Sequence, residues 1–107
     1  FSAELFRKGI DIEAPYGEQI RAVEGGRVIF ADRFPGYGKM MVVDHGERYY
    51  TVYAHLSELL KKNGETVRKG EPIALVGDSD SLAGARLYFE IRKDGKPLDP
   101  VPWFKKQ

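Results

Sequence analysis

Arg86-Leu87-Tyr88-Phe89-Glu90-Ile91-Arg92 is a run in which apolar and polar residues alternate strictly. This alternation is typical of a β-strand, because successive side chains of a strand point to opposite faces of its sheet. Leu87, Phe89 and Ile91 are therefore predicted to face the core. The other face carries two guanidinium groups, a carboxylate and a phenol, which fits either a solvated outer face or a recognition surface.

Similar short runs of β-branched and aromatic residues recur along the chain, and glycines and prolines separate them. Asn63-Gly64 and Asp94-Gly95 are typical of tight hairpin turns, because these residue types tolerate a positive φ. The sequence therefore predicts an all-β domain of short strands joined by turns. The expected strands are residues 19–23, 27–32, 39–44, 49–55, 66–67, 72–76 and 86–92. One helical turn is expected at residues 57–62, with Ser57 as its N-cap.

Length, charge and composition exclude several classes of function. A chain of 107 residues holds one domain, and a net charge of +1 argues against an electrostatic binder of nucleic acid. The absence of Cys excludes a disulfide scaffold, a thiolate zinc site and a Cys nucleophile. No apolar run approaches the roughly 18 residues of a membrane span. Because the sequence starts at Phe1 without Met or a signal-like segment, we expect residues 1–107 to be the C-terminal part of a longer chain.

Several motifs, taken in order, resemble those of LytM-type (lysostaphin-like) zinc metallopeptidases. They are Lys8-Gly9-Ile10-Asp11, the pair of strands between Gly17 and Gly26, Gly36-Tyr37-Gly38, Val42-Val43-Asp44-His45-Gly46, Tyr53-Ala54-His55-Leu56-Ser57, Gly64-x-x-Val67-x-x-Gly70-x-x-Ile73 and Leu87-Tyr88-Phe89-Glu90-Ile91. The resemblance extends from about Leu5 to Trp103. It implies an antiparallel β-sheet or sandwich of the duplicated hybrid-motif type, with a groove over the sheet. In active members of the family it also implies zinc-dependent cleavage of peptide cross-links in peptidoglycan.

The positions that bind zinc in active members are mostly replaced here. Those members use the His and Asp of an HxxxD motif and the second His of an HxH motif, and the matching positions hold Arg7, Asp11 and Tyr88. A catalytic zinc needs about three protein ligands and an open position, so we expect no metal, no cofactor and no catalytic residue. Of the auxiliary catalytic positions, one holds Arg86 and only His55 still matches. One or both arginines are expected to pair with Asp11, in place of the metal's charge.

The ending Leu-Tyr-Phe-Glu-Ile-Arg resembles that of degenerate family members that activate cell-wall amidases. This resemblance implies a non-catalytic partner of an N-acetylmuramoyl-L-alanine amidase, acting in cell separation in the periplasm or cell envelope of a diderm bacterium. Tyr and Arg are enriched in interface hot spots, so the groove left by the zinc site is the expected partner surface. The expected partner-binding residues are Lys8, Asp11, Tyr37, Met40, Tyr53, His55, Arg86, Tyr88 and Arg92.

Three alternatives remain open from the sequence. The first is an active zinc endopeptidase with rearranged ligands, for instance Asp11, His55 and His45. The second is a module that binds peptidoglycan directly through the groove. The third is a swinging-arm carrier, because residues 64–74 resemble biotinyl and lipoyl domains, although Lys39, the only Lys beside a Met, precedes this stretch. For Tyr37, contact with a partner and cover for the core remain equally open.

Overall fold

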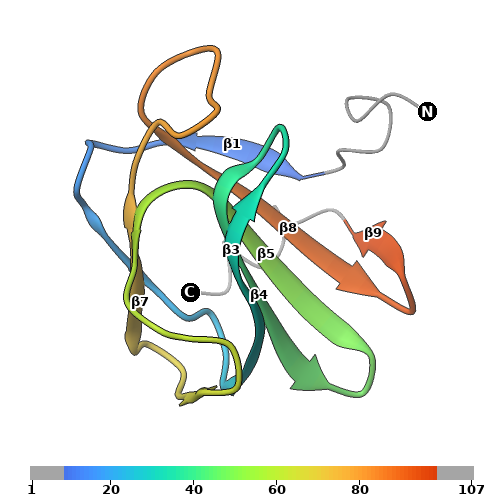
Figure 1. Ribbon diagram of the computed structural model, residues 1–107. Coiled ribbons are helices and arrows are strands. Elements are labelled where there is room, and N and C mark those ends of the chain that lie inside the picture. Colours follow the sequence, from blue (N-terminus) through green and yellow to red (C-terminus); the bar gives the residue numbers. More distant parts are fainter. Residues whose placement is uncertain (1–8, 99–107) are drawn as a thin grey trace.

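The computed structural model describes residues 9–98, and all regular structure in that part of the chain is β-strand (Figure 1). The strands are β1 (Ile10–Glu13), β2 (Gln19–Arg21), β3 (Gly26–Phe34), β4 (Gly38–Gly46), β5 (Tyr49–Leu59), β6 (Thr66–Val67), β7 (Pro72–Val76), β8 (Arg86–Lys93) and β9 (Lys96–Leu98). Every strand pair is antiparallel. The all-β prediction is thus confirmed. No helix that could cross a membrane occurs within the described range.

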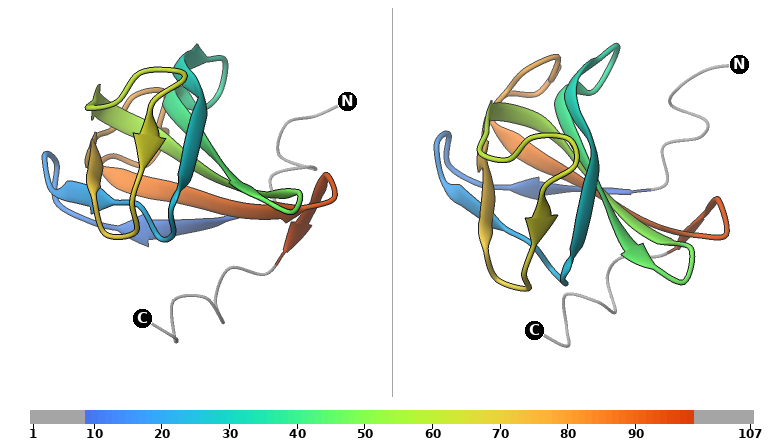
Figure 2. Two further views of the ribbon diagram at one scale, coloured as in Figure 1. Left: turned by 90° about the horizontal axis from the view of Figure 1, so that it is seen from below. Right: turned by 60° about the horizontal axis from the view of Figure 1, so that its bottom comes forward.

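The strands form one strongly bent sheet in the order β1-β8-β5-β4-β3-β6, and β7 joins β2 to the far end of β5. The first part of β5, from Tyr49 to Ala54, pairs with β8, whereas Leu56, Glu58 and Leu59 pair with β7. The change of partner occurs at His55, whose φ of 61° is left-handed. Strands β2, β6 and β7 consequently fold over one face of the sheet (Figure 2).

The main core lies between these two parts of the bent sheet. Phe89 and Ile91 of β8 are buried in it and Leu87 packs against it, as the alternation predicts. A smaller apolar cluster covers the opposite, outer face of β4, β5 and β8. It consists of Met40, Val52, Ala54 and Tyr88, with Phe30, Tyr37 and Val42 packed against it.

The helical turn expected at residues 57–62 is absent, because β5 continues to Leu59. The Ser57 hydroxyl donates hydrogen bonds to the carbonyl oxygens of Leu75 and Val76, at 3.4 and 2.9 Å, instead of capping a helix. Pairing with a strand distant in sequence therefore overrides a weak local preference for a helix, which is marginal at this length. Strands β1 and β9 were not predicted. Both are short, and each pairs only with β8.

Tyr53 lies in the main core, so the prediction that it contacts a partner is wrong. Its side chain is fully buried, with 0% exposure. The Thr51 hydroxyl and the Val23 N–H both donate to its oxygen, at 3.2 and 3.4 Å. Thr51 and Tyr53 share the inner face of β5, but the left-handed backbone at His55 ends the alternation. The His55 ring instead lies against Tyr88, with 6.2 Å between ring centroids.

Replacing Tyr53 by Phe should lower stability and leave partner binding unchanged. The variant keeps the ring but leaves the partly buried Val23 N–H without its acceptor, while the Thr51 hydroxyl keeps its contact with His45 Nε2, so we expect a cost of about 1 kcal/mol. Burial raises the pKa of Tyr53 above its ordinary value of 10.0. As the pH rises, Tyr53 therefore ionises in the unfolded chain before it does so in the folded domain. The preference of the fold for the neutral phenol then lowers stability as the pH rises above about 10. Urea unfolding at neutral and at alkaline pH should show a smaller alkaline loss in the Phe variant. Equal stability of both proteins at both pH values would contradict this.

Candidate functional site

The outer face of the sheet carries an apolar pocket of about 270 Å³. We call it the outer pocket, and it is lined by Phe34, Tyr37, Met40, Val42, Tyr50, Val52, Glu90 and Arg92. Sequence reasoning predicted Tyr37, Met40 and Arg92 as site residues but missed the others. Strand alternation could have found Val42, Tyr50, Val52 and Glu90, because even-numbered residues of β4, of β5 up to Ala54, and of β8 share the outer face. Phe34 lies at the end of β3, outside this pattern.

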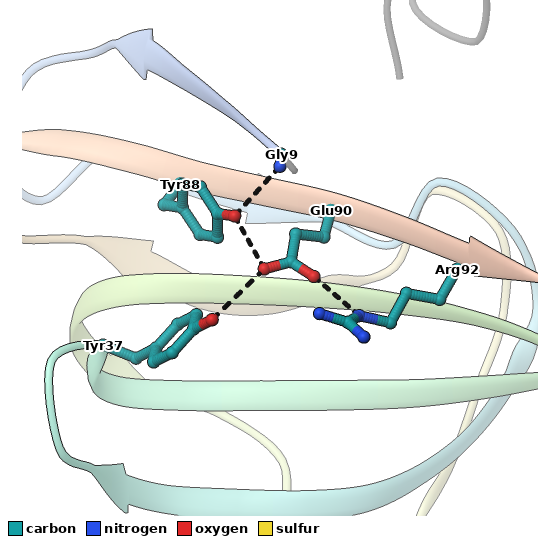
Figure 3. Close-up of polar contacts among 5 residues, drawn as sticks. All are labelled: Gly9, Tyr37, Tyr88, Glu90 and Arg92. Atoms are coloured by element: carbon teal, nitrogen blue, oxygen red, sulfur yellow. Dashed lines mark hydrogen bonds and ion pairs between the residues drawn. The ribbon is translucent and has the colours of Figure 1, made fainter. Parts of the chain in front are cut away.

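Tyr88 and Glu90 are buried beneath this face, with 3% and 1% exposure. The Tyr88 hydroxyl donates to Glu90 Oε2 at 2.6 Å and accepts the Gly9 N–H at 2.9 Å (Figure 3). The Tyr37 hydroxyl donates to the same Glu90 oxygen at 3.4 Å, and Arg92 Nε–H donates to Glu90 Oε1 at 2.7 Å. For Tyr88 and Glu90, a solvated outer face is therefore the wrong interpretation. Together these residues form what we call the Glu90 network.

Asp11 and Arg86 lie side by side on β1 and β8. Arg86 Nη1 is 3.6 Å from Asp11 Oδ2, and Arg86 Nη2 donates to the Ala83 carbonyl oxygen at 3.0 Å. The expected ion pair is present, but the distance is longer than a hydrogen bond, so the pair is not bidentate. The pair is partly exposed, so it contributes at most about 1 kcal/mol to stability. Arg7 and Lys8 lie outside the described residues.

His55 holds together two loops at one end of the sheet. Its N–H donates to the Tyr37 carbonyl oxygen at 2.7 Å, and its Nδ1 lies 2.8 Å from the Ser79 carbonyl oxygen, which only accepts. The Ser79 hydroxyl oxygen accepts the Lys39 N–H at 3.0 Å. These contacts connect the β3–β4 turn to the β7–β8 loop, which stand at the same end of the sheet (Figure 1). His55 therefore stabilises this end of the sheet, and direct contact with a partner stays a prediction.

The rearranged zinc site of Asp11, His55 and His45 is not assembled. His45 Nδ1 lies 2.7 Å from the Gly25 carbonyl oxygen, and its Nε2 lies 2.7 Å from the Thr51 hydroxyl oxygen. Across residues 9–98, no three His, Asp or Glu side chains are grouped so that they could hold a metal ion. His45 thus connects the β4–β5 hairpin to the segment that precedes β3.

Comparison with known proteins identifies the family. Residues 5–100 match the model of Peptidase family M23. The chain belongs to this family. This M23 domain is 44% identical over 100 residues to the murein hydrolase activator EnvC of Escherichia coli K12, covering 94% of the chain and 24% of EnvC. It is 37% identical over 101 residues to the murein hydrolase activator NlpD of the same strain, covering 94% of the chain and 26% of NlpD.

A zinc containing peptidase from Vibrio cholerae has a solved structure with the same fold. The TM-score is 0.83 at 34% identity, over 86% of this M23 domain and 28% of the peptidase. The LytM-type fold and the resemblance to murein hydrolase activators are thus confirmed. The chain spans about a quarter of the length of EnvC and NlpD. Because activators and a peptidase share the fold, the function must be argued from the site.

Proposed function

We propose that this M23 domain is a non-catalytic activator of N-acetylmuramoyl-L-alanine amidases, which it binds through the outer pocket. The observation that carries the proposal is the hydrogen bonding of Tyr88. At a position where active members have a zinc-binding His, this phenol donates its proton to Glu90 and accepts the Gly9 N–H. The ligand position has thus become part of a polar network around Glu90.

The residues around Asp11 do not fit a catalytic zinc ion. Such an ion needs about three protein ligands and an activated water, and Asp11 is the only one of the family's ligand residues that this sequence retains. Its carboxylate lies against the Arg86 guanidinium. Arg stays protonated in proteins and has no lone pair to offer a metal. The ion pair therefore supplies a cation where an active member would hold zinc.

The outer pocket has the composition of a surface that binds protein. Among residues 9–98, its aromatic and aliphatic walls adjoin one cation, Arg92, whose side chain is 32% exposed. Tyr and Arg are the residue types that dominate interface energetics. We infer that the occupant is a segment of the amidase with an apolar side chain for the pocket and an acidic side chain for Arg92. Tyr37, Met40 and Arg92 would contact it directly.

Activation would then be a shift of population in the amidase. In this proposal, the amidase segment that the outer pocket binds has two positions, one that blocks the amidase active site and one that is displaced from it. A domain that binds only the displaced segment favours the open enzyme by its difference in affinity. Because the relatives EnvC and NlpD are named murein hydrolase activators, we place this activity in the periplasm or cell envelope, where it would support cell separation.

Mixing the purified domain with amidases from the same genome and with dye-labelled peptidoglycan tests the proposal. We expect no dye release by the domain alone, and more release by an amidase with the domain than without it. We also expect less than one zinc per domain after purification without added metal. Release by the domain alone that a chelator stops would support the zinc endopeptidase instead. Sedimentation with sacculi in the absence of stimulation would support a peptidoglycan-binding module.

A further inference from the structure

We propose that Glu90 is a positioning residue, whose buried carboxylate fixes the guanidinium of Arg92 and thereby the direction from which an acidic partner group must approach. This inference rests on the proposed function, because it concerns the same pocket. Glu90 itself does not touch the partner. It acts through Arg92 and, on its other oxygen, through the two tyrosines.

The two oxygens of Glu90 have separate tasks. Oε1 accepts the Arg92 Nε–H, while Oε2 accepts the Tyr88 and Tyr37 hydroxyls (Figure 3). All three neighbours donate, which suits a carboxylate because it only accepts. An amide of the same shape replaces one oxygen with a donor. Gln at this position could therefore satisfy one side of the network but not both.

Burial makes this arrangement rigid. Glu90 is 1% exposed, and a buried carboxylate is costly unless it stays paired and hydrogen-bonded. The Tyr88 hydroxyl is in turn held by the backbone N–H of Gly9, which lies 79 residues away in sequence. The Glu90 carboxylate therefore cannot turn out into solvent. It holds the Arg92 guanidinium from the buried side of the pocket.

Arg92 is thus bound to Glu90 through the Nε edge of its guanidinium, and the Nη edge faces the partner. Its Nε–H is directed at Glu90, and within residues 9–98 no other hydrogen-bond partner of its guanidinium is found. The Nη groups remain for a carboxylate, which arginine can bind in a bidentate manner. Because the guanidinium is already ordered, binding loses less side-chain entropy than with a mobile arginine. The fixed guanidinium also sets the spacing that a partner segment needs between its acidic residue and the apolar residue that enters the outer pocket.

The first test is a double-mutant cycle on binding to the amidase that the wild-type domain stimulates best. We expect Glu90→Gln and Arg92→Ala each to weaken binding about tenfold, and the double variant to bind about as weakly as Arg92→Ala alone. Glu58→Gln is the matched control, since Glu58 is an exposed residue of β5. Wild-type affinity of Glu90→Gln, or losses that multiply in the double variant, would overturn the positioning role.

Arg92→Lys distinguishes orientation from charge without disturbing Glu90. Lysine keeps the positive charge but lacks the planar fork and the Nε–H. If Glu90 works by orienting that fork, Arg92→Lys should bind nearly as weakly as Arg92→Ala. Wild-type affinity of Arg92→Lys would show that only the charge matters. This variant also gives a result if Glu90→Gln proves too unstable to assay.

A third measurement needs no partner. Nitrogen-15 NMR of the arginine side chains reports how fast the Arg92 Nε–H exchanges with water. We expect a slow exchange in the wild type and in Glu58→Gln, and a fast one in Glu90→Gln. Equal rates in all three would overturn the inference. If no amidase is stimulated, the proposed function fails while this measurement still decides for or against the Glu90–Arg92 contact.

Discussion

Reversing the charge of Arg92 with Arg92→Glu should abolish amidase stimulation, with a loss of affinity of about 100-fold or more. The variant removes the partly exposed cation that lines the outer pocket among the described residues. It also places a second carboxylate beside buried Glu90, which then loses its ion-pair partner. An acidic partner group would meet repulsion instead of attraction.

The control for Arg92→Glu is Arg68→Glu, which changes the net charge equally. Arg68 is exposed in the turn between β6 and β7 and does not line the outer pocket. Stimulation should survive in this control, and thermal melting should show that both variants fold. Equal stimulation by the two variants would exclude Arg92 from the binding surface. A similar charge reversal at Lys8 is expected to impair stimulation, although Lys8 lies outside the described residues.

The structure changes what is expected of Tyr88→Glu. From the sequence, this variant should abolish stimulation and leave the fold intact. Tyr88 is buried, however, and its hydroxyl already donates to Glu90. A new carboxylate there would lie beside another buried carboxylate, so the variant should disturb folding as well. Tyr88→Phe is the better probe, because it removes only the hydroxyl.

Gly77→Ala should cause a large loss of stability, of about 3 kcal/mol or more. Gly77 is buried at the end of β7, and a Cβ there would lie 2.7 Å from both the Leu56 carbonyl carbon and the Ser57 Cα. It would also press on the Ser57 backbone nitrogen. All these atoms belong to the backbone of β5, so no side chain can rotate away. The sheet would have to separate where β5 changes its partner from β8 to β7.

The matched control for Gly77→Ala is Gly25→Ala. A Cβ on Gly25 would meet its nearest atom, the Val67 carbonyl oxygen, at 3.5 Å, which is an ordinary contact. Chemical unfolding of both variants measures the difference. A Gly77→Ala domain as stable as the Gly25→Ala domain would show that β5 and β7 are less tightly packed than the structure indicates. Because Ser79 follows closely and holds the β7–β8 loop to Lys39, Gly77→Ala should also reduce amidase stimulation.

Strand alternation is the part of the structure that sequence could predict well. It placed Phe89 and Ile91 in the core, because a strand that covers a core must bury one face. The alternation ends at His55 in β5, where one left-handed residue reverses the direction of the following side chains. The helical turn predicted at residues 57–62 was wrong. The signals for that turn were local, whereas the pairing with β7 is not.

The site was only partly predictable, for a related reason. Three positions of the family's zinc site are visible in the sequence: the retained ligand Asp11, the replaced ligand position Tyr88 and the auxiliary position Arg86. The structure brings all three together at the β1–β8 pairing. Burial of Glu90, however, depends on donors contributed by Tyr37 and, through Tyr88, by Gly9. Those segments meet only in the folded sheet. A lone Glu in an alternating strand therefore looks like a surface residue until its neighbours are known.

The two faces of the sheet suggest how such a domain can be redesigned. In β4, β8 and β5 up to Ala54, odd positions such as Met41 and Phe89 fill the main core, while even positions such as Met40 and Val42 form the outer face. Randomising exposed or half-exposed even positions would sample new partner specificities on an unchanged scaffold. The buried even positions should be kept, namely Met40, Val52, Ala54, Tyr88 and Glu90. In such a library, variants would differ in the partner they bind while they keep the same core and the same fold.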